Sequence, residues 1–392
     1  MKNFYILFST FITIALFCLN NKLYCQNSIT IEGKIIDAHT EEPLPFASVH
    51  LKSAPMGVIS GENGYFSFHF PEIYGADTLC ISSIGYEQQR ISLNNYKSNE
   101  TIKLLPKTYS LEEVTVMAIS ARDILKKAIK NIKKNYPHQP YTLAGDFHEY
   151  IRESDKYVRA LEASVHLTDE NAFKLKGEYF IIDSISLSVS RIKEEHQQLL
   201  FKNQILSIYL EFGILLNYST IDSDGKYTIE DIKQNGTEKI YVIKCVGETY
   251  EQTYHINASD YAITYSKFVR TKPAINDSET NDIWRDYLED SSVIALRKYG
   301  EYYYPFYLYN YLTLRQHKGK DNPNALYTYT SYSQMLVTNI ENSAIRKKRK
   351  NLKRGYEDIY FSKVPVKKVW KNYNTLPNSK IRREALKQLE IQ

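Results

Sequence analysis

Apolar and polar residues alternate with a period of two through much of residues 29–104, and this constrains the fold more than any other feature. Residues 29–35, 47–51 and 65–70 each place apolar side chains at every second position, as half-buried strands do. Turn-forming residues separate these segments, among them Asn63-Gly64, which tolerate the positive φ of a tight turn. Six or seven short strands, with turns about every 8–12 residues, predict a β-sandwich over residues 27–106.

Three motifs within this segment are similar to those of the carboxypeptidase-like regulatory domain, a transthyretin-like sandwich of seven strands. The matching residues are Gly33, Asp37, Pro43, Leu44, Ala47 and Val49 in the first motif, Gly57, Gly64 and Phe66 in the second, and Ser82, Gly85 and Tyr86 in the third. Glu62 stands where the family usually has Asp. The resemblance covers about 75 residues and implies a non-catalytic, Ig-like module.

The segment after the sandwich resembles a linker known from outer-membrane receptors. Residues 109–116 (YSLEEVTV) are similar to the L-x-E-V-x-V stretch that follows this domain in TonB-dependent receptors. In those proteins a plug and a transmembrane β-barrel come next. Only 276 residues follow Val116, and they lack regular ten-residue strands with lipid-facing alternation. We therefore expect a protein related to the receptors, without their barrel.

Residues 1–25 are predicted to be a signal peptide. Lys2 precedes an apolar run from Phe4 to Leu19, which is shorter than the roughly 20 residues of a membrane span and has the layout of a secretory signal. A lipid anchor on Cys18 or Cys25 is the alternative, but bulky residues precede both cysteines. We expect an exported protein of the periplasm or outer membrane, with no transmembrane span after signal removal.

The net charge excludes one class of partner, and the cysteine content bears on disulfide formation. Removing residues 1–25 lowers the net charge from +5 to +3, so nucleic acid is not an expected partner. The two remaining cysteines, Cys80 and Cys245, fall in different predicted domains. Two separate buried thiols are therefore expected, although an exported protein could pair them.

The rest of the chain is predicted to be a helix followed by a second β domain. Apolar residues recur at helical spacing after Ser120, which with Asp123 forms a capping arrangement, and Pro137 ends the helix. Residues 107–137 are thus a linker and helix. Residues 138–392 form a Tyr-rich antiparallel β domain with further helices expected at residues 193–212 and 379–390.

A stretch of this second domain is similar to envelope lipoprotein carriers of the LolA type. The pattern Y-x-I-x-C at residues 241–245, followed by Y-H-I-N-x-x-D-Y-A-I at residues 254–263, resembles their strand pairs. The resemblance implies an open, strongly bent antiparallel sheet whose concave side can hold acyl chains or a peptide. A plain antiparallel domain with a filled core is the alternative. The chain as a whole is thus predicted to be mainly β.

Residues 302–312 form a strand with aromatic side chains on both faces. One face carries Tyr303, Tyr307, Tyr309 and Tyr311, and the other carries Tyr302, Tyr304 and Phe306. Aromatic residues on both faces exceed what one buried face requires. The four tyrosines of the first face are the predicted contact surface for a glycan or lipid. A strand buried on both sides is the alternative.

A basic run at residues 346–354 contains seven basic residues in nine. Its predicted anionic contacts are Arg346, Lys347, Lys348, Arg349 and Lys350. In an exported protein, lipid headgroups or acidic polysaccharides are suitable partners. A solvated loop, or an edge strand protected by lysines, is the alternative.

No motif of known chemistry occurs in the sequence. It has no H-E-x-x-H zinc motif, no G-x-S-x-G elbow and no phosphate-binding glycine loop. We expect no catalytic residues, metal or cofactor. The predicted function is a non-enzymatic binding or assembly module at the outer membrane, with envelope proteins, and lipid or glycan, as partners. A lipid- or lipoprotein-handling protein and a hydrolase are the alternatives.

Overall fold

The computed structural model describes residues 27–107, 119–169, 180–192, 225–235, 238–280, 283–319, 325–342 and 374–391. Several predicted features lie outside these residues: the signal peptide at 1–25, the receptor-like linker at 109–116, the helix at 193–212 and the basic run at 346–354.

Seven strands form the N-terminal sandwich, as predicted. One sheet has the order β4-β1-β7 and the other β3-β2-β5-β6. Their bounds are β1 (Ser28–Asp37), β2 (Ser48–Leu51), β3 (Gly57–Ile59), β4 (Tyr65–Pro71), β5 (Thr78–Ser82), β6 (Gln89–Ser92) and β7 (Glu100–Leu104). Single 3-10 turns follow β4 (η1, Glu72–Tyr74) and β6 (η2, Leu93–Asn95). The apolar side chains of the alternating segments, such as Ile35, Val49 and Phe68, are fully buried between the two sheets.

The tight turn before β4 depends on glycine. Gly64 has a φ of +76°, and a Cβ at this position would meet the carbonyl oxygen of Ile35. The positive φ and the close approach both favour glycine, which agrees with the predicted Asn63-Gly64 turn.

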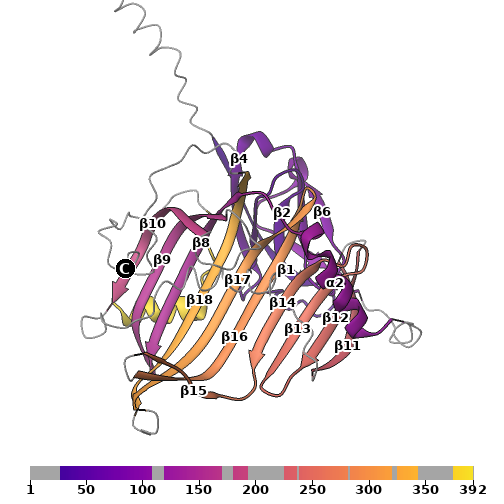
Figure 1. Ribbon diagram of the computed structural model, residues 1–392. Coiled ribbons are helices and arrows are strands. Elements are labelled where there is room, and N and C mark those ends of the chain that lie inside the picture. The colour runs from indigo at the N-terminus through magenta and orange to yellow at the C-terminus, as the bar shows by residue number, and fades with distance from the viewer. Residues whose placement is uncertain are drawn as a thin grey trace, which may run out of the picture.

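The second part of the chain is a curved antiparallel sheet of eleven strands (Figure 1). Its order is β10-β9-β8-β18-β17-β16-β14-β13-β12-β11, with β15 paired to β16. The bounds are β8 (Tyr141–Glu153), β9 (Lys156–Asp169), β10 (Phe180–Ile192), β11 (Lys226–Asn235), β12 (Glu238–Val246), β13 (Tyr250–Asn257), β14 (Ile263–Arg270), β15 (Ala274–Thr280), β16 (Ile283–Tyr299), β17 (Tyr302–Lys318) and β18 (Ala325–Asn342). The last strand of this sheet in chain order, β18, pairs with the first, β8. Both therefore lie in the middle of the sheet, while β10 and β11 are at the two ends of the strand order.

The predicted linker helix is α2 (Ala121–Asn135). The Ser120 hydroxyl oxygen accepts a hydrogen bond from the Asp123 backbone N–H at 3.1 Å, which is the predicted cap. Ile124, Leu125 and Ala128 are buried in the same apolar core as the inward-facing residues of the large sheet. The helix therefore covers one face of that sheet.

The sandwich covers the opposite face. Met335 and Val337 of β18 belong to the core shared with α2, whereas Leu336 between them belongs to the core of the sandwich. Because side chains alternate across a strand, α2 and the sandwich lie on different sides of the sheet. The second confirmed helix, α5 (Lys380–Gln388), lies on the sandwich side, where Ala385 packs against Tyr150.

Candidate functional site

A cavity of about 770 Å³ lies between the sandwich and the large sheet. The sandwich lines it with residues of β2, β3, β5 and the loops beside them, and the segment around α5 contributes Pro377, Ser379 and Ile381. The sheet supplies the remaining wall, mainly from β13, β14, β16, β17 and β18. The cavity is thus built by both parts of the chain, and neither part encloses it alone.

Strand register explains which side chains of the sheet face the cavity. His255 on β13, Tyr265 on β14, Ala295 on β16 and Tyr307 on β17 lie opposite one another in successive strand pairs, and all four line the cavity. Leu308, the next residue of β17, points the other way and is fully buried in the core shared with α2. From Tyr307 onward, alternation along β17 supplies both a packed core and a wall that a ligand can reach. The register shift between Ala295 and Leu296 places Phe306 on the cavity side together with Tyr307.

Three of the four predicted contact tyrosines line the cavity: Tyr303, Tyr307 and Tyr309. Burial raises the pKa of Tyr307 and raises that of Tyr309 to about 12, so both hydroxyls are neutral hydrogen-bonding groups. The Tyr303 hydroxyl donates to Asp260 and accepts from Asn257, each at 3.0 Å, so it also holds the β13–β14 turn in place.

Tyr311, the fourth tyrosine, lies outside the cavity wall. Its hydroxyl donates to Glu289 at 2.5 Å, and its ring packs on Tyr332 with centroids 5.1 Å apart. The predicted anionic contacts, Arg346 to Lys350, are outside the described residues. Both predictions of a contact surface remain untested by the geometry.

Two histidines of the cavity wall were not among the predicted site residues. Burial, together with the charges of Arg297 and Arg90, holds the pKa of His50 well below its usual value. Burial lowers the pKa of His255 to about 3. Both imidazoles are therefore neutral at physiological pH. His255 stacks on Tyr265, with ring centroids 4.5 Å apart.

Arg297 is the principal charged residue of the wall where sandwich and sheet meet. Its guanidinium donates a hydrogen bond to the Ser48 hydroxyl and lies over the Phe306 ring, 4.5 Å from the centroid. Ser48 and Arg297 are separated by 249 residues in the chain. No local sequence pattern could have indicated that they would meet.

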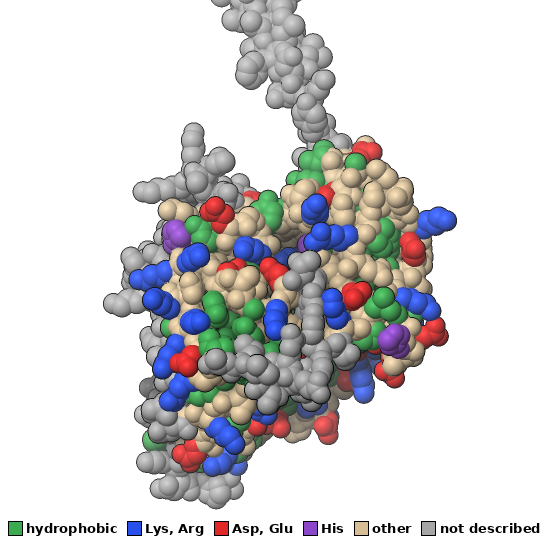
Figure 2. All heavy atoms as spheres, turned by 90° about the vertical axis from the view of Figure 1, so that its right-hand side faces the viewer, with side chains coloured by type: hydrophobic (Ala, Val, Ile, Leu, Met, Phe, Trp, Pro, Cys, Tyr) green, Lys and Arg blue, Asp and Glu red, His purple; other side chains and the backbone are tan. Residues whose placement is uncertain are grey.

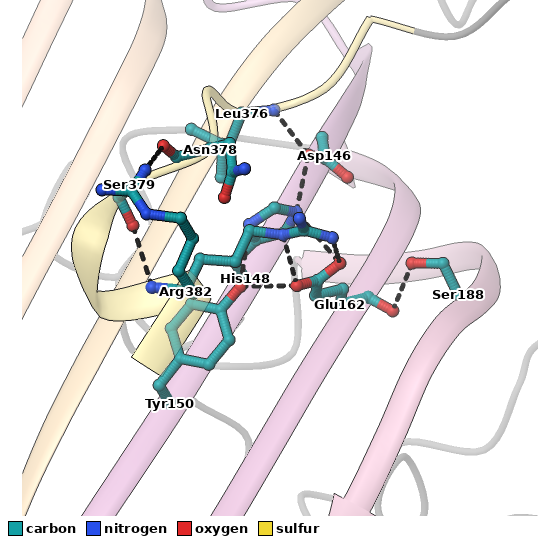
Figure 3. A network of polar contacts seen from close by, with 10 residues as sticks. Asp146, His148, Tyr150, Glu162, Ser188, Leu376, Asn378, Ser379 and Arg382 are labelled. Atoms are coloured by element: carbon teal, nitrogen blue, oxygen red, sulfur yellow. Dashed lines mark hydrogen bonds and ion pairs between the residues drawn. The ribbon is translucent and has the colours of Figure 1, made fainter. Parts of the chain in front are cut away.

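A buried polar network joins α5 to the sheet beside the cavity (Figure 3). The Arg382 guanidinium binds Glu162 through two hydrogen bonds of 2.8 and 2.9 Å, and Tyr150 donates to the same carboxylate at 2.6 Å. His148 lies 2.9 Å from Asp146, which also accepts the backbone N–H of Leu376 at 2.7 Å. Since Tyr150 also lines the cavity, the network fixes one part of its wall.

The network favours a protonated His148. Burial alone would lower its pKa, but the carboxylates of Asp146 and Glu162 outweigh burial and raise the pKa above its ordinary value. The Tyr150 hydroxyl donates to Glu162, so its oxygen can accept a hydrogen bond from Nδ1 of protonated His148, 3.2 Å away. All the charged groups of the network are then satisfied.

The protein is expected to lose stability as the pH rises above the pKa of His148. A histidine whose pKa is higher in the folded than in the unfolded state stabilises the fold fully below its unfolded pKa, about 6.5, and loses that contribution as the pH rises through the folded pKa. Urea titrations at pH 6 and pH 9 should show a larger decline for the wild type than for His148→Gln. Equal declines in the two proteins would contradict this prediction; replacing the exposed His39 serves as the control.

Among the residues that the structure describes, no group of three or more His, Cys, Asp or Glu side chains is placed to hold a metal ion. None of the helices in those ranges has the length and hydropathy needed to cross a membrane. Cys80 and Cys245 are both buried and free, as expected for thiols in different domains.

The N-terminal part of the chain matches a known family of domains. The family model of the CarboxypepD_reg-like domain matches residues 31–116. No curated protein sequence matches the chain. Among solved structures, a LolA superfamily protein from Nitrosomonas europaea is 10% identical with a TM-score of 0.21, over 59% of this chain and 96% of its own. A DUF1329 family protein from Desulfovibrio piger is 7% identical with a TM-score of 0.27, over 58% and 95%. The match to residues 31–116 confirms the resemblance to the carboxypeptidase-like regulatory domain that the three sequence motifs predicted.

Proposed function

We propose that this protein is a non-enzymatic binding module of the cell envelope, exported to the periplasm or the outer membrane, which holds an amphiphilic molecule between its sandwich and its sheet. The observation that carries the proposal is the cavity itself. Its volume of about 770 Å³ lies within the range of roughly 300–1,000 Å³ that small-molecule sites occupy. Export rests on the predicted signal peptide at residues 1–25.

The lining suits the apolar part of such a molecule. Phe306, Tyr307 and Tyr309 present rings along β17, and Val293 and Ala295 add aliphatic surface from β16. Rings of this kind combine a large apolar surface with a polar tip. An acyl chain or another extended apolar group would be desolvated along this wall.

Apolar side chains of the sandwich continue this surface toward solvent. Phe46 and Ile84 both line the cavity, yet 54% of Phe46 and 41% of Ile84 are exposed. Phe46 also has a φ of +58°, a strained conformation that persists only where the surrounding structure enforces it. The Phe46 ring lies 6.1 Å from that of Tyr307. The surrounding structure thus holds an apolar ring where a ligand would enter or leave.

The arrangement around His50 argues for binding over hydrolysis. Ser48 Oγ lies 3.4 Å from His50 Nδ1, a pairing that a serine nucleophile would need. Such a base also needs a carboxylate to orient it and to stabilise its imidazolium. The charged groups that act on His50 are instead two cations, Arg297 and Arg90. These cations disfavour the protonated imidazole that a hydrolytic step would form.

A neutral fluorescent probe tests the proposal. N-phenyl-1-naphthylamine, whose emission rises in apolar surroundings, should bind the purified chain in a saturable one-to-one manner and raise its unfolding temperature. Absence of saturable binding, together with no stabilisation by acyl-chain amphiphiles, would overturn the binding function. Fractionation of cells that produce the full chain tests its location, and recovery in the cytoplasm alone would overturn export.

A further inference from the structure

Arg297 is a cation built into the cavity wall without a counter-ion. Among the residues that the structure describes, Ser48 Oγ is its one hydrogen-bond acceptor, and no carboxylate lies within ion-pair distance. The Phe306 ring stabilises the charge through a cation–π contact. A guanidinium has five N–H donors. The contacts with Ser48 and Phe306 leave most of the Arg297 donors unused.

Arg297 is half-buried where the sandwich meets the sheet, a position that is unfavourable for a charge without a counter-ion. Burial lowers the pKa of Arg297 to about 10, which still leaves it charged at neutral pH. Removing a charged group from water is unfavourable unless it is paired. The carboxylates of the cavity wall, Glu62 and Glu238, form no ion pair with Arg297 within the described ranges. The protein therefore maintains an uncompensated cation at this place.

His255 adds an unused polar atom to the same wall. Its Nδ1 is buried and has no hydrogen-bond partner among the described residues, and only 8% of the residue is exposed. His255 lies in the cross-strand row that contains Ala295, two residues before Arg297. Buried polar atoms are normally hydrogen-bonded, and an exception calls for an explanation such as a missing ligand.

Basic side chains outnumber acidic ones in the cavity lining by three (Lys267, Arg297 and Lys298) to two (Glu62 and Glu238). Lys267 and Lys298 line it as well, and Lys298 is already paired with Asp260 at 3.1 Å. In the view of Figure 2, Lys and Arg side chains gather around a hollow between the two halves of the molecule, with fewer acidic ones among them. The surroundings of Arg297 thus favour an anion over a cation.

We propose that the ligand of this cavity carries a carboxylate or phosphate group that pairs with Arg297, while its apolar part lies along Tyr307 and Tyr309. The inference rests on the proposed binding function and specifies its ligand class. Carboxylate and phosphate oxygens match the planar fork of a guanidinium.

The test compares two probes that differ only in the anionic group. cis-Parinaric acid and its methyl ester share one fluorescent acyl chain, and the wild type should bind the acid at least tenfold more tightly. Arg297→Gln should remove this preference, so that acid and ester bind with equal affinity, whereas Arg297→Lys should keep part of it. Lys134→Gln, which removes one exposed positive charge on α2, is the matched control and should bind both probes like the wild type.

Competition distinguishes the sources of the anion. Lysophosphatidic acid should displace the acid probe, and inorganic phosphate should displace it only if the anionic group is recognised without a chain. Equal affinities of the wild type for acid and ester would overturn the inference while leaving the binding function intact. Failure of both probes to bind would overturn the binding function itself. The comparison of acid and ester affinities on the wild type tests the inference even if Arg297→Gln does not fold.

Discussion

Replacing Arg382 by alanine is expected to lower the free energy of unfolding by about 3–5 kcal/mol, because it leaves the buried carboxylate of Glu162 without the guanidinium that binds both of its oxygens. Only 4% of the Glu162 side chain is exposed, and both of its oxygens accept hydrogen bonds from the Arg382 guanidinium. The α5 helix is also tied to the sheet by the backbone N–H of Tyr157, which donates to Gln388 at 2.8 Å. Urea denaturation followed by circular dichroism measures the loss.

The adjacent arginine provides a control for this prediction. Arg383 is on the same helix, but its guanidinium donates to the backbone carbonyl of Asn378 in an exposed position. Arg383→Ala should therefore cost less than about 1 kcal/mol. A second comparison uses Arg382→Met combined with Glu162→Gln, which removes both charges and should be less harmful than Arg382→Ala alone. A loss for Arg382→Ala no greater than that for Arg383→Ala would refute the structural role of this pair.

The sandwich and α2 were predictable because their signals are local. A period of two, an Asn-Gly turn and a capping Ser120 each act within a few residues, and the same residues carry the family motifs. The polar network gave no such signal. Glu162 and Arg382 are separated by 220 residues, and only the docking of α5 against β8 and β9 brings them together. Neither residue stood out in the sequence.

The cavity could be predicted only in part from the sequence. Alternation in β17 predicted that Tyr307, Tyr309 and Tyr311 share a face, but it could not indicate how far along the strand the sandwich extends. Tyr311 lies beyond the cavity and bonds to Glu289. Arg297 and His50 were unrecognised because each is an isolated residue in its own strand. Their importance depends on the packing of one domain against another.

Filling the cavity from the sheet side is expected to abolish binding. Ala295 lies in the cross-strand row between Tyr265 and Tyr307, so the indole of Ala295→Trp would occupy the space that the apolar part of the ligand needs. Affinity for N-phenyl-1-naphthylamine should fall about 100-fold, equivalent to about 2.7 kcal/mol. Because the added ring enters existing space and displaces no packed core, the unfolding temperature should change little. Fluorescence titration and thermal unfolding provide the two readouts.

A tryptophan placed elsewhere separates blockage from a general effect of the added indole. Ile73, in the 3-10 turn after β4, is 80% exposed and does not line the cavity. Ile73→Trp should therefore bind the probe with wild-type affinity. If Ala295→Trp binds as tightly as Ile73→Trp while both remain folded, the probe occupies some other surface, and the cavity between sandwich and sheet is not the binding site. If only Ala295→Trp loses binding, the ligand lies along the cross-strand row that contains Ala295.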